Sequence, residues 1–429
     1  MKRTSMWRSA IRASCALLAI SLSVATAASA SPSHRAGGTI TVGVLYAFTG
    51  ANAQNGTVGN AGCQTGVAVV NKAGGVLGNT LQCATADTKS DLADAVPAAN
   101  QLLAASTPAF VIGPSDEAPA TVPVVTGNKV PEFATVGDPK FDTNTDSYFY
   151  RITPSDALQG RAIGYWAPHH GYTHGAAVFT NDLGAQTSVG PLRDTYKKEG
   201  GKLVANLSLA PGHTSYRTEV VKLLASHPDA IFTEMDPATS ATFLSEMVQL
   251  GGGKLPPIIT TQRGAQIDWL AAVSKALGSS RFTTSVTFIA PYVKFAGSGY
   301  ASYKSTLLTL GSKVHDPKQY LVHPYAIADY DAIMIASLAM TEAKSTKGSD
   351  FNKLITQVTA PKAGATIVHS YAEGVRALKA GKKIQYIGTS GSLVFNRYHS
   401  APSAFAQFRY DPKTKQPVVV KLIPGSKIA

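Results

Sequence analysis

From Thr39 to Thr261 the chain alternates short runs rich in β-branched residues with longer stretches of helical periodicity. Such alternation is typical of a parallel sheet whose strands are joined by covering helices. Strands are expected at Thr39–Leu45, Thr80–Ala86, Phe110–Ile112, Glu132–Ala134, Gly175–Phe179, Lys202–Leu207, Ala230–Phe232 and Pro257–Thr261. Helices are expected at Asn60–Lys72, Asp91–Ala105, Ser155–Trp166, Ser188–Glu199, Ser215–Ala225, Ala238–Leu250 and Ala332–Met340. The chain should therefore have an α/β fold.

The first 30 residues have the pattern of a secretory signal peptide. Residues Met1–Arg12 carry four cations and no acid, an apolar run follows at Ala13–Val24, and small residues end the segment at Ala28–Ala30. The run is too short to cross a bilayer, which takes about 20 residues. We therefore expect a protein exported to the periplasm. About 400 residues would remain, enough for two domains.

Two cysteines, Cys63 and Cys83, follow the predicted leader. In an oxidising compartment an isolated pair is most simply one disulfide, which would close a loop of roughly 20 residues and contribute about 3 kcal/mol. Two buried free thiols are the alternative.

The formal net charge of +13 falls to +9 when the four leader cations are removed. A basic chain could bind nucleic acid, but here the cations are scattered and no stripe of alternating basic and aromatic residues appears. We therefore expect no nucleic-acid partner.

Four glycines, Gly66, Gly74, Gly75 and Gly78, cluster near the end of the first predicted helix. A phosphate-binding loop lies between a strand and the start of a helix, where free N–H groups face the anion. Gly74, Gly75 and Gly78 instead follow a helix and precede a strand, so we interpret Gly74 and Gly75 as a helix stop and Gly78 as a turn. No cofactor is expected.

Six loops leave the carboxyl ends of predicted strands, where open α/β sheets bind their ligands. They are rich in hydroxyl groups and glycine, which suits a small polar ligand held between two sheets. The loops are Tyr46–Gly50, Gly113–Asp116, Thr135–Asp138, Thr180–Gly184, Thr233–Asp236 and Thr261–Gly264. Tyr292, Tyr325 and Tyr330 could also line the cleft, although such tyrosines more often belong to core or surface.

Six short motifs occur in order along the chain: "VGVLYAFTG", "VNKAGGVLG", "ADTKSD", "YRITPSDALQG", "YDA" and "YIGTSGSLVFN". Together they resemble the type I periplasmic solute-binding proteins of ABC importers, in the branch that binds branched-chain amino acids. The resemblance implies two Rossmann-like lobes, three hinge strands and closure around a solute. It places lobe 1 at residues 39–153 plus 291–385 and lobe 2 at 154–290 plus 386–429. It also implies the Cys63–Cys83 disulfide.

Only some of the family's ligand-contact positions hold matching residues in this chain. A hydroxyl position falls on Ser115, a second contact falls near Gly137 and Asp138, and an aromatic position falls on Leu183. The acidic residue that pairs with an ammonium group falls on or next to Arg263, which reverses the charge. With the strand-end loops, the expected ligand-binding set is Phe48, Thr49, Ser115, Gly137, Asp138, Leu183, Met235 and Arg263.

The positive charge of Arg263, at a position where the family has an acidic residue, affects which solutes can bind. A guanidinium repels an ammonium group and attracts a carboxylate. We therefore expect a solute with a carboxylate or another acceptor-rich group, rather than a plain aliphatic amino acid. Alternatively, Arg263 pairs with Asp138 or Asp182 and is structural.

Other functions have less support in the sequence. The only histidine cluster, His169, His170 and His174, lacks a partner in metal-ligand register and is expected in a solvated loop. No nucleophile elbow or paired-carboxylate site indicates a hydrolase. The expected function is a monomeric, non-enzymatic receptor that delivers its solute to ABC permease subunits. A sensor of the same fold, acting with a separate signalling partner, is the alternative.

Overall fold

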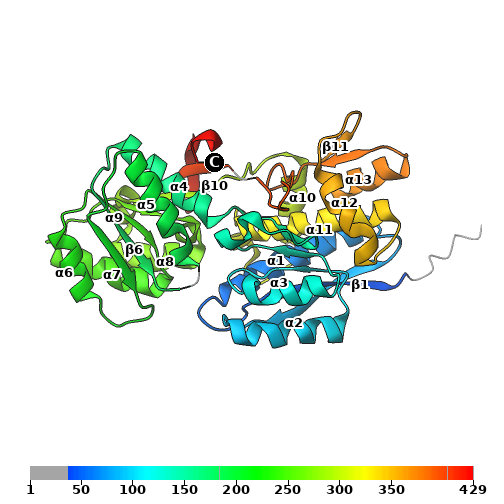
Figure 1. Ribbon diagram of the computed structural model, residues 1–429, viewed down its shortest axis with the longest axis horizontal. Coiled ribbons are helices and arrows are strands. Elements are labelled where there is room, and N and C mark those ends of the chain that lie inside the picture. Colours follow the sequence, from blue (N-terminus) through cyan, green and yellow to red (C-terminus); the bar gives the residue numbers. More distant parts are fainter. Residues whose placement is uncertain (1–36, 183, 403, 429) are drawn as a thin grey trace, which may run out of the picture. The chain divides into compact units, whose positions relative to one another are not determined.

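The computed structural model describes residues 37–182, 184–402 and 404–428. The predicted signal peptide and Leu183 lie outside them. The described chain contains a five-stranded sheet, a seven-stranded sheet and a small two-stranded sheet. Each large sheet carries its own helices and forms one lobe (Figure 1), which confirms the predicted α/β class with two lobes.

The first lobe is built around a parallel sheet with the order β2-β1-β3-β4-β5. Its strands are β1 (Thr39–Tyr46), β2 (Thr80–Asp87), β3 (Phe110–Ile112), β4 (Glu132–Ala134) and β5 (Phe149–Arg151). The intervening helices are α1 (Gln54–Lys72), α2 (Leu92–Ser106), α3 (Ala118–Gly127) and the 3-10 helix η1 (Pro139–Thr143). The predicted bounds of β3 and β4 are confirmed.

The chain returns to this lobe later, in the yellow to orange part of Figure 1. The returning elements are α10 (Gly297–Leu307), η5 (Pro317–Tyr320), α11 (Pro324–Ala343), α12 (Gly348–Thr359), β11 (Thr366–Val368), α13 (Tyr371–Lys379) and β12 (Ile384–Tyr386). Helix α11 packs against α1 and α12. Every residue from Ala326 to Met340 is buried, which confirms the predicted buried helix and extends it toward Pro324. No helix in the described ranges is long and apolar enough to cross a membrane.

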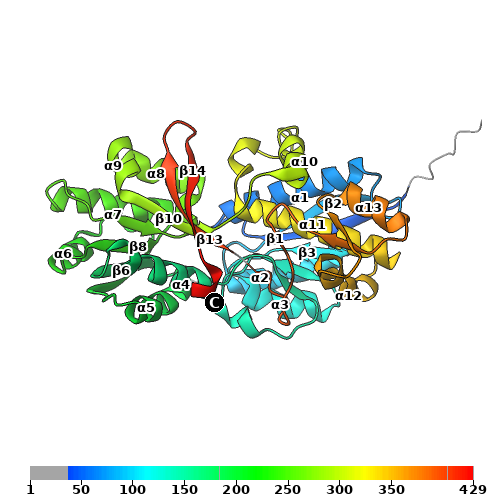
Figure 2. The ribbon, with the colours of Figure 1, turned by 90° about the horizontal axis from the view of Figure 1, so that it is seen from above.

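The second lobe contains the sheet β14-β13-β10-β9-β8-β6-β7. Its strands are β6 (Gly175–Thr180), β7 (Ala205–Leu209), β8 (Ala230–Glu234), β9 (Ile258–Thr260), β10 (Val286–Pro291), β13 (Phe405–Asp411) and β14 (Gln416–Ile423). Its helices are α4 (Asp156–Trp166), η2 (Pro168–His170), η3 (Ala185–Ser188), α5 (Val189–Lys198), α6 (Arg217–Ala225), α7 (Pro237–Leu250), η4 (Gln262–Ala265), α8 (Ile267–Leu277), α9 (Ser279–Ser285) and η6 (Gly425–Lys427). The hairpin β13–β14 runs antiparallel beside β10 (Figure 2), so this sheet is mixed rather than purely parallel.

The chain passes between the lobes after β5, after β10 and between β12 and β13. The third passage is anchored on the first lobe, because the buried carboxylate of Asp331 on α11 accepts hydrogen bonds from Tyr386 Oη (2.7 Å), Thr389 N (2.9 Å) and Ser390 N (2.6 Å). Leu393 packs in the same core cluster as α11. The lobe limits, including the one at residue 386, stay a prediction.

Local sequence signals explain where elements begin and end. Asp236 caps α7 by accepting hydrogen bonds from the N–H groups of Ala238 and Thr239, as its position before Pro237 predicts. Gly75 follows α1 with a φ of +70°, and a Cβ there would lie 2.0 Å from Asn79 O. Gly75 therefore takes part in the predicted helix stop, and Gly78 makes the predicted turn with a φ of +83°, whereas Gly66 lies within α1.

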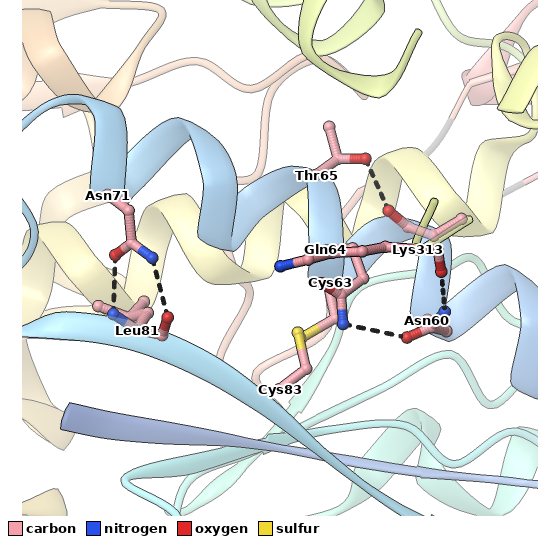
Figure 3. Close-up of a disulfide and its surroundings, with 9 residues drawn as sticks. Asn60, Cys63, Gln64, Thr65, Asn71, Leu81, Cys83 and Lys313 are labelled. Carbon is pink, nitrogen blue, oxygen red and sulfur yellow. Dashed lines mark hydrogen bonds between the residues drawn. A yellow bond between two sulfur atoms is a disulfide. The ribbon is translucent and has the colours of Figure 1, made fainter. Parts of the chain in front are cut away.

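A disulfide joins Cys63 on α1 to Cys83 on β2 (Figure 3), with an S–S distance of 2.03 Å. Close to it, the Asn71 side chain donates to Leu81 O (2.9 Å) and accepts from Leu81 N (2.7 Å). The first helix is thus tied to the second strand covalently and by hydrogen bonds. The predicted disulfide is confirmed.

Candidate functional site

A cavity with about 430 Å³ of space, part of it open to solvent, lies at the carboxyl ends of strands from both large sheets. Its polar lining comes mainly from loops that follow β3, β4, β6, β8 and β9 and from the first turns of α1, α4 and α11. The lining residues are Asn55, Ser115, Asp116, Gly137, Asp156, Gly184, Glu234, Gln262, Arg263, Gln266 and Tyr325. The cavity is therefore where open α/β sheets are expected to bind ligands.

Arg263 is the only cation among these lining residues. Its Nη2 donates to Asn52 Oδ1 at 3.2 Å, and its Nε lies 3.9 Å from Glu234 Oε1. The side chains of Arg263 and Glu234 are only 11% and 12% exposed, so the two charges interact in a poorly hydrated space. Burial acts to lower the pKa of Arg263, but Glu234 and other acids outweigh it and raise this pKa. The acid closest to the guanidinium is Glu234, which lies in the predicted loop Thr233–Asp236 but was not among the expected partners, Asp138 and Asp182.

Three carboxyl groups share the cavity with this one guanidinium. Burial raises the pKa of Glu234 to about 7, against the opposing effect of Arg263. Burial, reinforced by Glu234, raises the pKa of Asp156 well above its usual value. Burial also raises the pKa of Asp116, although Arg263 acts in the opposite direction. The cavity therefore holds more acidic groups than basic ones.

The hydrogen bonds of the two aspartates leave part of their accepting capacity free. Asp116 Oδ2 accepts from the Asn52 amide at 3.1 Å, and the same amide contacts Arg263 through its oxygen. Asp156 Oδ2 accepts from Thr187 Oγ1 at 2.6 Å. An ionised carboxylate can accept about four hydrogen bonds, so both can receive donors from a bound molecule.

Two side-chain contacts connect the lobes at the edge of this cavity. The amide of Gln262, after β9, donates to the hydroxyl of Tyr325 in the first turn of α11. The side-chain amides of Gln54, on α1, and Gln266, before α8, are also in contact. Of the tyrosines considered from sequence, Tyr325 lines the cavity, whereas Tyr330 is fully buried in the core.

Three residues of the expected ligand set line this cavity: Ser115, Gly137 and Arg263. Gly137 is close to Asp156, since a Cβ at Gly137 would lie 2.1 Å from Asp156 Oδ1. A side chain at Gly137 would therefore displace a cavity carboxylate.

The other expected residues lie elsewhere in the described chain, apart from Leu183, which falls outside it. The backbone N–H groups of Phe48 and Thr49 donate to the Asp87 carboxylate, and the Thr49 hydroxyl donates to its second oxygen. Asp138 caps η1 by accepting from Lys140 N. Met235 is 1% exposed in the core of the second lobe. Their roles in ligand binding stay predictions.

The histidine cluster has local partners. The His169 ring contacts Tyr165, and the His170 ring stacks on Trp166 at 4.0 Å between centroids. Across residues 37–182, 184–402 and 404–428, no group of three or more His, Cys, Asp or Glu side chains is placed to hold a metal ion.

The model of the periplasmic binding protein family matches residues 39–379, most of the chain. The chain belongs to the periplasmic binding protein family. The resemblance inferred from the six motifs is thereby confirmed.

Solved structures with the same fold include members of this family from several bacteria. The leucine-binding protein LivK from Thermotoga maritima is 17% identical, with a TM-score of 0.71, over 90% of this chain and 99% of that one. LivJ from Streptococcus pneumoniae, solved with isoleucine, is 18% identical with a TM-score of 0.70 over the same shares. An ABC transporter solute-binding protein from R. palustris, solved with benzoate, is 14% identical with a TM-score of 0.69, over 90% and 96% of the two chains. No curated protein matches the chain in a sequence comparison.

Proposed function

We propose that this periplasmic binding protein captures one small polar solute in the cavity around Arg263 and delivers it to the permease subunits of an ABC importer. The observation that carries the proposal is the convergence of strand-end loops from both large sheets on one polar, partly enclosed space. The similar structures include an ABC transporter solute-binding protein with benzoate and a branched-chain amino acid transporter protein with isoleucine, two ligands that carry a carboxylate, which supports the same class of solute.

The charges of the cavity suggest what the solute carries. The guanidinium of Arg263 has one hydrogen bond, to Asn52, and its remaining N–H groups suit a carboxylate of the solute. Asp116 and Asp156 call for hydrogen-bond donors or a positive group, because a buried carboxylate without such partners is unfavourable. The solute would therefore present acceptors toward Arg263 and donors toward the aspartates.

Binding would act through the two lobes. The solute would contact Ser115 and Asp116 on one lobe and Glu234 and Arg263 on the other. Such contacts stabilise the closed arrangement of the lobes, in which the two pairs of residues are close. The three passages of the chain between the lobes would serve as the hinge. The protein would act outside the cytoplasm, as a monomer and without catalysis.

Native mass spectrometry of the freshly purified protein tests this proposal, because a receptor often retains its solute. A thermal-shift screen of carboxylic acids, amino acids and amides then ranks candidates. A ligand at 100 times its dissociation constant should raise the unfolding free energy by about 2.7 kcal/mol. If no solute co-purifies and no compound shifts the transition, the proposal fails.

Arg263→Ala separates the binding role of Arg263 from a structural one. Loss of a charged hydrogen bond should weaken solute binding by about 10- to 100-fold in calorimetry, with a folded unliganded protein. Arg281→Ala is the matched control, because Arg281 is half-buried and donates to Leu277 O outside the cavity. Unchanged affinity in Arg263→Ala would contradict the role.

A further inference from the structure

The β13–β14 hairpin forms one edge of the second lobe's sheet, and β14 is the edge strand. Strand β13 pairs with β10 only from Phe405 to Phe408, so the distal part of the hairpin extends beyond this pairing (Figure 2). Five consecutive residues of β14, from Val418 to Leu422, are exposed. Because successive side chains of a strand point to opposite faces, both faces of β14 are open to solvent.

The exposed part of β14 is apolar. Val418 and Val419 are each 42% exposed, and Val420 and Leu422 are each 52% exposed. Six other large apolar side chains are exposed in the described ranges, and no two of those are neighbours in sequence. Single exposed apolar residues are normal on a protein surface, whereas a contiguous group of them indicates an interaction surface.

The same hairpin is basic. Residues 405–423 contain one acid, Asp411, and four cations, which give a net charge of +3. The carboxylate of Asp411 accepts hydrogen bonds from Lys413 N and Thr414 Oγ1 within the turn of the hairpin. The charge of the hairpin calls for an anionic partner. The four cations, all exposed, are Arg409, Lys413, Lys415 and Lys421.

A protein strand fits this edge poorly. Gln407 pairs with Lys421 and Phe408 with Val419, so Val420 is an extra residue that forms a β-bulge. A bulge and a lysine on an edge strand are features that prevent the addition of another strand. A second copy of this chain would also bring two hairpins of charge +3 together, which is unfavourable. A lipid surface demands no backbone register and supplies both negative charge and an apolar layer.

We propose that the β13–β14 hairpin binds the anionic surface of a phospholipid membrane. The cations would contact the lipid phosphates, and the exposed valines and Leu422 would enter the boundary between headgroups and acyl chains. This inference goes beyond solute capture, because it concerns where the protein is held. A receptor concentrated at the membrane lies near the permease subunits to which we propose it delivers its solute.

Co-sedimentation with lipid vesicles tests the proposal on the exported protein, without its predicted signal peptide. One set of vesicles contains equal parts of phosphatidylglycerol and phosphatidylcholine, and the other contains phosphatidylcholine alone. With a net charge of +3, the hairpin should bind the anionic vesicles about 100-fold more strongly than the neutral ones. Sodium chloride at about 0.5 M should abolish this difference, because it screens exposed charges. Absence of binding to anionic vesicles, or equal binding to both sets, overturns the proposal.

Two substitutions separate the charged and apolar contributions. Lys421→Gln should weaken binding to the anionic vesicles by about fivefold, and Val420→Ser by about three- to fivefold. Lys198→Gln, on the exposed end of α5, is the control for the first change. Val221→Ser is the control for the second, because Val221 is 56% exposed on α6. Equal effects of the hairpin variants and their controls would contradict the proposal.

A tryptophan reporter shows which part of the protein touches the lipid. The tryptophans of the described chain, Trp166 and Trp269, are only 5% and 0% exposed, so a new exposed tryptophan dominates any response. The emission of Val420→Trp should move to shorter wavelength with anionic vesicles, and that of Val221→Trp should not. Vesicle binding without this shift overturns the role of the hairpin. Because no solute is present, these results do not depend on whether the polar cavity binds one.

Discussion

Glu234 offers a test of the electrostatics of the polar cavity. Its carboxyl is 12% exposed and lies 3.9 Å from Arg263 Nε. Burial raises its pKa from 4.5 to about 7 even though Arg263 opposes the change. Glu234→Gln keeps the size of the side chain and removes the ionisation. The variant should therefore lose the part of the pH-dependent stability that comes from this carboxyl.

The direction in which stability changes with pH follows from proton binding by Glu234. With a higher pKa in the folded protein than in the unfolded chain, Glu234 binds its proton more tightly when the protein is folded. The free energy of unfolding therefore falls as the pH rises from 4.5 to 7, by about 3 kcal/mol in total. Burial raises the pKa of Glu117 to about 7 as well, which gives a similar fall in both proteins. The difference between the two profiles therefore reports Glu234 together with its effect on the pKa of Asp156.

Urea unfolding of the solute-free protein at intervals from pH 4 to pH 8 measures this difference. From pH 4 to pH 8, the free energy of unfolding of Glu234→Gln should rise by about 3 kcal/mol relative to that of the unchanged protein. Glu219→Gln, on α6 of the same lobe, is the matched control for the loss of a carboxyl outside the cavity. Parallel profiles for Glu234→Gln and the unchanged protein would refute the reasoning.

Three further substitutions probe the disulfide, the third passage and the cavity wall. Joint replacement of Cys63 and Cys83 by serine should lower the unfolding free energy by about 3 kcal/mol in urea titrations, because their separation of 20 residues sets the loop entropy. Asp331→Asn should lower the thermal transition through a loss of about 3 to 5 kcal/mol, because an amide N–H would face a buried donor. Gly137→Ala should weaken solute binding by about tenfold in calorimetry, because its Cβ displaces Asp156.

Each of these three predictions has a control measurement that can contradict it. Dithiothreitol should destabilise the original protein but not the double serine variant, and an equal response would disprove the disulfide argument. Asp350→Asn, on α12, changes an exposed aspartate whose side-chain partners are Ser345 and Ser349, so it should lower the transition much less than Asp331→Asn. Gly127→Ala adds a Cβ that meets no atom within 4 Å, so it should bind solute normally.

The sequence predicted those parts of the fold that depend on local pattern. Phe110–Ile112 and Glu132–Ala134 are short apolar runs between helices, and both strands have the expected bounds. The hairpin β13–β14 was not predicted. Val418 and Val420 are exposed on the edge strand β14, so this strand lacks a buried apolar face, and the pairing of β13 with β10 depends on tertiary contacts. The strand expected at Lys202–Leu207 lies at Ala205–Leu209, where it pairs with β6.

The candidate site was predicted only in part, for a physical reason. The rule that ligands bind beyond the carboxyl ends of strands brought Ser115, Gly137 and Arg263 to one cavity. It included Glu234 in the Thr233–Asp236 loop without giving it a role, and it did not identify Asp156, because a carboxyl at a strand end is usually solvated and only packing shows that these two are buried. Acidic residues at strand ends near a lone arginine would have been the signal.

The account depends on one polar cavity that holds a single solute between the two lobes. A crystal structure of the protein with the solute found by mass spectrometry tests this most directly. We expect one molecule within hydrogen-bonding distance of Arg263 and of Asp116 or Asp156, with residues of both lobes in contact. A solute bound to one lobe only, or outside this cavity, would contradict the account.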